Sequence, residues 1–141
     1  MEIGSAIIAG LVGTAVMTAL MYLGPRMGMP EMDMIGMLGT MVTADEGLAK
    51  PIGAVIHFMM GAIFAIIYAF VWANLFGAPT WLWGLVFGAI HGVIAIVTMP
   101  MMIRMHPRPP AMQMGPQMMM GILMGHLVFG LVVALVYGAL V

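Results

Sequence analysis

Apolar positions fill four long stretches of the chain, and polar positions are confined to the segments between them. The stretches cover residues 3–23, 51–76, 80–103 and 118–141, and none of them contains Asp, Glu, Lys or Arg. A helix of about 20 apolar residues crosses the hydrocarbon core of a bilayer. The pattern therefore predicts an all-α fold: a polytopic membrane protein whose single domain, residues 1–141, is a bundle of four transmembrane helices.

The segment between the first two spans, residues 24–50, also carries a helical pattern. Pro30 followed by Glu31 and Asp33 is typical of a helix start, because negative charge is favourable at a helix N-terminus. Four apolar residues at helical spacing then predict a short helix lying on the membrane surface. These four residues are Met32, Ile35, Leu38 and Val42.

Two further local signals concern the loops at the same end of the spans. Thr43 and Glu46 fit a capping box that leads into the second helix. Residues 104–117 are rich in proline and methionine, and proline interrupts helices, so this loop is expected to be extended.

The orientation of the spans is predicted from the aromatic and basic residues. Trp72, Trp81 and Trp83 surround the short turn between the second and third spans, which predicts an aromatic belt at that end. The four cations lie in loops 24–50 and 104–117, at the other end. The chain is expected to be a multi-pass protein of the cell (inner) membrane. By the positive-inside rule, both loops are expected on its cytoplasmic side and both termini on its outer side.

The chain also contains an internal similarity that predicts two tandem two-helix repeats. Gly10-Leu-Val in the first span corresponds to Gly84-Leu-Val in the third. The second and fourth spans share a longer motif, His57-x3-Gly61-x6-Tyr68 and His126-x3-Gly130-x6-Tyr137. Units with an even number of spans enter the membrane from the same side, so an axis along the membrane normal would relate them.

Small residues at four-residue spacing predict close packing between the helices. In lipid the hydrophobic effect does not drive helices together, so close backbone approach must supply the contact. The same surfaces would suit a homo-oligomer or a larger membrane complex. The residues are Ala65, Ala69, Ala73, Gly84, Gly88, Gly92, Gly121 and Gly125.

Composition excludes several classes of function. Hydrophobic residues make up 64% of the chain and charged residues 6%, too few to cover a soluble core. Cysteine is absent, which excludes disulfides and thiolate chemistry. The net charge of -1 without a basic run argues against nucleic acid as a partner. The uncharged spans exclude a carboxylate proton relay, and we assign no catalytic residue.

Three histidines lie inside the predicted spans and are candidates for cofactor binding: His57, His91 and His126. A titratable group within a span is costly and usually faces the bundle interior. The repeat would relate His57 and His126, which could approach each other across the axis. The alternative is that each is a neutral imidazole bonded to a neighbouring helix, with Thr14, Thr18 or Thr98 as partner.

Methionine is unusually abundant, at 21 residues, and most lie at or near the charged end. Thioether and imidazole ligands suit Cu(I). Flexible apolar packing or a methionine-coated groove explains the same abundance and is the favoured interpretation. The candidate metal ligands, chosen for one-turn spacing or proximity to a histidine, are Met17, Met21, Met105, His106, Met120, Met124 and His126.

Several short motifs resemble one known family of small prokaryotic membrane proteins, the domain-of-unknown-function family 6789. The resemblance covers most of the chain, and it implies a four-helix membrane bundle in which His57 and His126 belong to a family pattern. It implies no mechanism. The motifs are Met32-Asp-Met-Ile-Gly-Met-Leu-Gly39, Ile56-His-Phe-Met-Met-Gly61, His126-Leu-Val-Phe-Gly130 and Tyr137-Gly138.

Three functional hypotheses follow from these observations. The first is a small non-catalytic subunit or ligand-binding bundle. The second is binding or transport of copper or another soft metal through Met and His. The third is a haem-binding redox subunit with two of the histidines as axial ligands, since a four-helix bundle can hold such a cofactor between facing helices.

Overall fold

The computed structural model describes residues 1–110, 112 and 114–141. Four long helices, α1 (Ile3–Leu23), α3 (Glu46–Val71), α4 (Trp81–Met105) and α5 (Pro116–Leu140), are each long and apolar enough to cross a membrane. The short helix α2 (Met34–Val42) precedes α3. A 3-10 turn η1 (Gly24–Met27) follows α1, and a π turn η2 (Trp72–Phe76) ends α3. The described part of the chain has no strand, so the predicted all-α membrane fold is confirmed.

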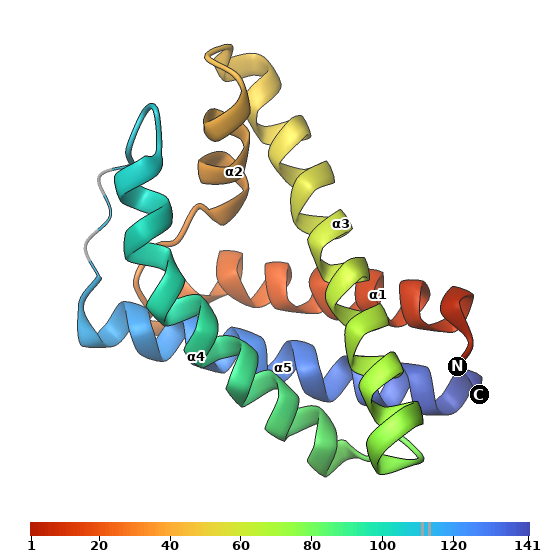
Figure 1. The fold of residues 1–141 in the computed structure, drawn as a ribbon. Helices are drawn as coiled ribbons and strands as arrows, with labels where there is room; N and C mark the ends of the chain where they lie inside the picture. The colour runs from red at the N-terminus through yellow and green to blue at the C-terminus, as the bar shows by residue number, and fades with distance from the viewer. Residues whose placement is uncertain (111, 113) are drawn as a thin grey trace.

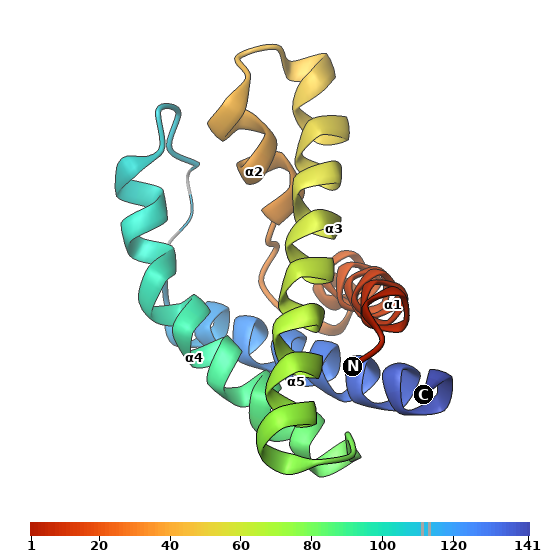
Figure 2. The same cartoon turned by 45° about the vertical axis from the view of Figure 1, so that its right-hand side comes forward.

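The four long helices form a bundle that is open on one side. α1 packs against α3 and α5, and α5 packs against α4. α3 and α4 are joined by the turn around Gly77 and diverge from it, so that their other ends lie far apart (Figures 1 and 2). The bundle is therefore narrow at the turn and wide at the end that carries the charged loops.

In each predicted repeat, an equivalent glycine contact holds the two helices together. A Cβ added to Gly10 would lie 2.6 Å from the carbonyl oxygen of Gly61 on α3. A Cβ added to Gly84 would lie 2.6 Å from the carbonyl oxygen of Gly130 on α5. Both distances are too short for any side chain, so α1–α3 and α4–α5 are close helix pairs with the same residues at the crossing.

One of the three tryptophans lies in the core instead of the predicted aromatic belt. Trp72 is 0% exposed, and its ring lies 5.4 Å from Phe87, 5.6 Å from Tyr68 and 6.4 Å from Tyr137 between centroids. It follows Tyr68 by one helical turn and so continues the interior face of α3. Trp81 is exposed, as a headgroup-level residue should be.

α2 begins at Met34, later than the start predicted at Pro30, so Met32 precedes the helix; α2 also packs against a neighbouring helix. Asp33 caps it, since its carboxylate accepts a hydrogen bond of 2.7 Å from the Gly36 N–H. Gly53 of α3 lies directly against the Ile35 carbonyl, which leaves no room for a side chain. Val42, placed on the apolar face by spacing, is 64% exposed because the helix ends there and its last residue passes beyond α3.

α3 begins before the apolar span at residue 51, as a cap in this segment predicts, but with a different capping residue. Its first residue is Glu46 and its cap is Asp45. The Asp45 carboxylate accepts hydrogen bonds from the N–H groups of Gly47 and Leu48, at 2.8 and 3.2 Å. Thr43 accepts only from the Asp45 N–H, so the predicted capping box is wrong. A carboxylate cap binds the same orphan amides more strongly than a hydroxyl.

Candidate functional site

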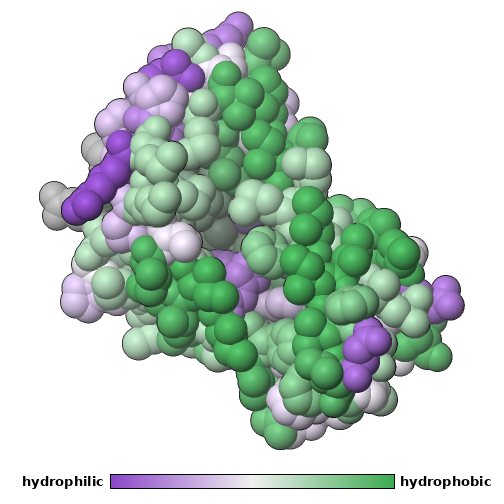
Figure 3. Space-filling model, in the orientation of Figure 1, coloured by the Kyte–Doolittle hydropathy of each residue, from purple (hydrophilic) through white to green (hydrophobic). Residues whose placement is uncertain are grey.

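A cavity of about 140 Å³ lies in the wide part of the bundle and contacts all four long helices and α2. Figure 3 shows a hollow in the face where α3 and α4 diverge, surrounded mainly by apolar side chains. Both predicted repeats contribute residues to the lining of the cavity. It contains all three of the histidines predicted as candidates, His57, His91 and His126.

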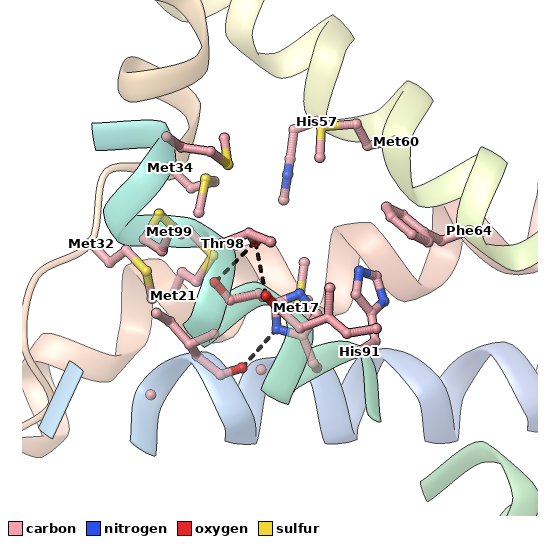
Figure 4. A pocket seen from close by; sticks show the side chains of 17 residues that line it. Met17, Met21, Met32, Met34, His57, Met60, Phe64, His91, Thr98 and Met99 are labelled. Atoms are coloured by element: carbon pink, nitrogen blue, oxygen red, sulfur yellow. Dashed lines mark hydrogen bonds between the residues drawn. The ribbon is translucent and has the colours of Figure 1, made fainter. Parts of the chain in front are cut away.

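Methionine side chains form much of the cavity wall. Met17 and Met21 come from α1, which the sequence had also suggested as a pair. Figure 4 shows the side chains of Met32, Met34 and Met99 gathered at one side of the space. Thioether side chains are flexible and polarisable, so this wall can adapt its shape to a bound molecule. The seven methionines are Met17, Met21, Met32, Met34, Met60, Met99 and Met102.

His57 is the most unusual residue of the cavity. It is 6% exposed, and its Nε2 has no hydrogen-bond partner among the described residues. Figure 4 shows its ring projecting from α3 into the cavity. Leaving a buried polar atom unpaired costs about 1–3 kcal/mol. A buried polar group that stays unpaired in a native fold is a candidate for contact with a ligand.

His126 and His91 form the opposite wall, with ring centroids 4.5 Å apart. The Nδ1 of His126 lies 2.7 Å from the Ile122 carbonyl oxygen, which can only accept, so Nδ1 carries the hydrogen. In a neutral ring Nε2 then holds a lone pair. The three threonines predicted as possible partners form no hydrogen bond to these histidines within the described part of the chain. They are Thr14, Thr18 and Thr98.

A tyrosine orients His91. The Tyr68 hydroxyl donates to the Phe87 carbonyl oxygen at 3.1 Å and lies 3.0 Å from the Nδ1 of His91. Because the hydroxyl has one hydrogen, the His91 Nδ1 donates to the tyrosine oxygen, which again leaves Nε2 with a lone pair. The Phe64 ring packs on the same imidazole at 4.0 Å. This wall of the cavity therefore presents hydrogen-bond acceptors.

The two repeats contribute equivalent positions to the cavity. His57 and His126 correspond by the spacing of the shared motif, and both line it. Met17 of α1 and His91 of α4 correspond by the spacing between Gly10 and Gly84, and both line it as well. The duplicated helix pairs thus bring one thioether and three imidazoles to equivalent places in a single site.

Two further spaces adjoin the cavity, one smaller and one larger than it. A pocket of about 50 Å³ extends it toward the narrow end, past Thr14 and Phe129. A second cavity of about 250 Å³ lies between the wide ends of α1 and α5. The second cavity shares five lining residues with the first: Met17, Met21, Met32, Gly121 and Gly125.

The candidate metal ligands do not gather at one place. Met17, Met21 and His126 line the first cavity, whereas Met124 lines only the second. Met105 and Met120 are 70% and 59% exposed, on outer faces of α4 and α5. Within the described ranges, no group of three or more His, Cys, Asp or Glu residues is placed to hold a metal ion.

His106 has a structural position instead. Its Nε2 donates to the Met37 carbonyl oxygen at 2.9 Å, and its Nδ1 accepts from the Arg108 N–H at 3.0 Å. The Arg108 guanidinium donates twice to the Thr40 carbonyl oxygen, at 2.6 and 3.0 Å. Both nitrogens of this buried ring are used, and they tie α2 to the C-terminal end of α4.

Sequence reasoning missed several of the cavity residues. Met60 lies one turn after His57, and Met99 and Met102 lie about two and three turns after His91 on α4. These helical spacings could have identified them, but the predicted ligands were chosen for pairs of methionines one turn apart and for methionines next to a histidine. Phe64 follows His57 by two helical turns, and its packing on His91 depends on the tertiary structure.

The first cavity, taken by itself, is too small for haem. An engineered cavity of about 150 Å³ holds one benzene ring, and this cavity has nearly the same volume. A haem macrocycle contains four pyrrole rings. His91 and His126 are also in direct ring contact, with no space for a macrocycle between them.

Comparison with known proteins agrees with the resemblance seen in the short motifs. No match is found among curated proteins or among solved structures. The model of one family matches residues 1–141, the whole length of the sequence. The four-helix membrane architecture is compatible with that match. The chain therefore belongs to the family of unknown function DUF6789.

Proposed function

We propose that this protein is a non-catalytic membrane protein that binds a small apolar ring compound carrying a hydroxyl group. The observation that carries the proposal is the unpaired Nε2 of His57, buried and directed into a cavity of about 140 Å³. That volume suits one six-membered ring. A ligand that bonds to His57 would relieve the cost of its unpaired nitrogen.

The opposite wall selects the polar group of the ligand. The Nε2 atoms of His91 and His126 hold lone pairs, so the matching ligand group is a donor such as a phenolic hydroxyl. His57 can donate to or accept from the same group. The described lining has no Asp, Glu, Lys or Arg, so a charged ligand would lose its hydration without an opposite charge.

The route into the cavity leads from the bilayer. The hollow opens where α3 and α4 diverge, and the outer faces of both helices are apolar (Figure 3). Ile63 and Ile67 on α3 and Val93 and Val97 on α4 are among the exposed apolar side chains of these helices. A ring compound dissolved in the hydrocarbon could enter sideways without crossing the charged loops.

The test is methyl NMR of the protein in lipid nanodiscs with isotope-labelled methionines. para-Cresol is the probe, because it combines one ring with one hydroxyl. The methyl signals of Met60 and Met99 are expected to shift on titration, whereas those of the exposed Met59 and Met101 are not. Equal small shifts at all four methyl groups would indicate simple partition into the lipid and would refute the proposal.

A matched substitution tests the role of the imidazole. His57→Phe keeps a planar ring and removes the unpaired nitrogen. We expect it to weaken para-cresol binding about tenfold, which corresponds to one hydrogen bond of about 1.4 kcal/mol. Toluene, which has the same ring without the hydroxyl, is the matched ligand and should bind both proteins equally.

Binding of Cu(I) is the second candidate, favoured by the seven thioethers and three imidazoles in one cavity. It can be separated from ring binding by replacing Met17 and Met21 together with leucine. Leucine conserves volume and apolar character, so ring binding should survive this change. Loss of Cu(I) retention with intact para-cresol binding would support a metal site, and unchanged retention would eliminate this choice of ligands.

The orientation in the membrane is part of the proposal. Loops 24–50 and 104–117 touch through Arg108 and Thr40, which supports their location on one side, and the basic residues favour the cytoplasm. The chain has no cysteine, so single-cysteine variants can be labelled without background. Glu31→Cys should react from the cytoplasmic side only, and Ala78→Cys from the outer side only.

A further inference from the structure

The second cavity differs from the first in its chemistry. It has a volume of about 250 Å³ and lies between the wide ends of α1 and α5. Its lining, as far as the structure describes the chain, contains no polar side chain, and includes Leu20, Met29 and Val128. The first cavity has hydrogen-bonding groups and the described lining of the second has none, and the two cavities are neighbours that share five lining residues.

Two glycines lie on the boundary between these cavities, and only flexible methionine side chains cover them. A Cβ on Gly121 would meet only the Met29 methyl carbon, at 3.6 Å, and one on Gly125 would meet only the Met17 side chain, at 3.4 Å. Gly84 and Gly88 on α4 differ, because a Cβ there would collide with the backbone of α5. Although sequence spacing suggested helix packing for all four, Gly121 and Gly125 do not pack against another backbone.

We infer that the occupant is a lipid with a hydroxylated ring as its head and one long apolar tail. This inference rests on the proposed function, since the ring would occupy the first cavity at His57. The tail would pass over Gly121 and Gly125 and lie in the second cavity. An alkyl or prenyl tail matches a lining without polar side chains, and a single tail matches a single path.

The same features argue against an ordinary phospholipid. Its phosphate would have to enter the first cavity, where the described lining provides no cation. Removing a phosphate from water without pairing it is far more costly than burying a phenol. Lining atoms of an empty apolar cavity also lose dispersion contacts that a lipid tail would restore.

The experiment compares para-cresol with para-decylphenol, which has the same head and a long tail. Both are titrated into the full-length protein in nanodiscs, at equal mole fractions in the lipid. para-Cresol should shift the methyl signals of Met60 and Met99 only. para-Decylphenol should shift these and also those of Met29 and Met124, which line only the second cavity.

A pair of substitutions on α5 then tests the location of the tail. Val128→Phe fills part of the second cavity, and Leu135→Phe places the same ring on a lipid-facing position nearer the other end. We expect Val128→Phe to abolish the shifts at Met29 and Met124 while leaving para-cresol binding intact. Leu135→Phe should change neither.

The outcomes distinguish this inference from the proposed function. If para-cresol binds and the tail of para-decylphenol shifts neither Met29 nor Met124, the tail remains in the bilayer. The inference then fails and the ring site stands. If para-cresol does not bind, both fail. If Val128→Phe leaves the tail-dependent shifts unchanged, the second cavity is not the tail site and the inference is overturned.

Discussion

His57 and His106 are both buried histidines, and the same substitution should change the free energy of unfolding in opposite directions. The Nε2 of His57 has no partner among the described residues, so it lowers the stability of the ligand-free protein by about 1–3 kcal/mol. His57→Phe removes that atom and keeps a planar ring. Because the site borders a cavity, the slightly larger ring has space. We expect the variant to be more stable by up to that amount.

His106→Phe should have the opposite effect. The substitution removes the hydrogen bond to the Met37 carbonyl oxygen, but this oxygen still has the Thr40 hydroxyl at 3.2 Å. It also leaves the Arg108 N–H without its acceptor. The expected loss is about 1–3 kcal/mol, mostly from that amide. The two variants should therefore differ by about 2–6 kcal/mol, which is large against the whole stability of a small protein.

The assay is reversible unfolding in mixed micelles with increasing dodecyl sulfate, followed by tryptophan fluorescence in a variant that keeps the buried Trp72 and has Trp81 and Trp83 replaced by phenylalanine, and by far-ultraviolet dichroism. Coincident transitions by the two probes would justify a two-state treatment. The reasoning is refuted if His57→Phe destabilises the protein as much as His106→Phe does. That result would mean that Nε2 of His57 is already paired in the membrane, for example by water, and is not available to a ligand.

Three further predictions follow from the same contacts. Gly53→Ala should undock α2 and lower the free energy of unfolding by about 1–3 kcal/mol, because the new Cβ would collide with the Ile35 carbonyl. Gly125→Ala should raise the free energy of unfolding by up to about 1 kcal/mol through its higher helix propensity. Unfolding curves of the two variants test this. Arg108→Gln should speed amide exchange in α2 and leave exchange in α5 unchanged, because its bonds to Thr40 hold α2 to α4. Tyr68→Phe should weaken para-cresol binding several-fold without reducing helix content, since it frees the His91 ring to turn; unchanged affinity would show that His91 does not contact the ring.

The helices and their pairing could be predicted from the sequence because they depend on local patterns. Runs without charge define spans by length alone, and α1 begins and ends at the predicted residues. The existence of α2 was predicted from local spacing, although it starts at Met34, after Asp33, and not at Pro30. The repeat was visible because Gly10 and Gly84 serve the same close crossing in both halves.

Other positions were decided only by tertiary structure. Tryptophan is typical of the headgroup layer, yet Trp72 is buried because it lies on the same face of α3 as Tyr68. His106 carried no local sign of its bond to Met37, since 69 residues separate them. Local spacing does not report which residues of distant segments meet.

The candidate site shows the same division. The sequence by itself determined that three histidines lie in the spans and that Met17 and Met21 share a helical face. Only the tertiary structure decided that these residues surround one cavity, that the Nε2 of His57 is left unpaired, and that Met105 and Met120 point away. The physical reason is that a cavity is the space left between helices. Its existence depends on how α3 and α4 diverge, and a local pattern of residues does not specify that angle.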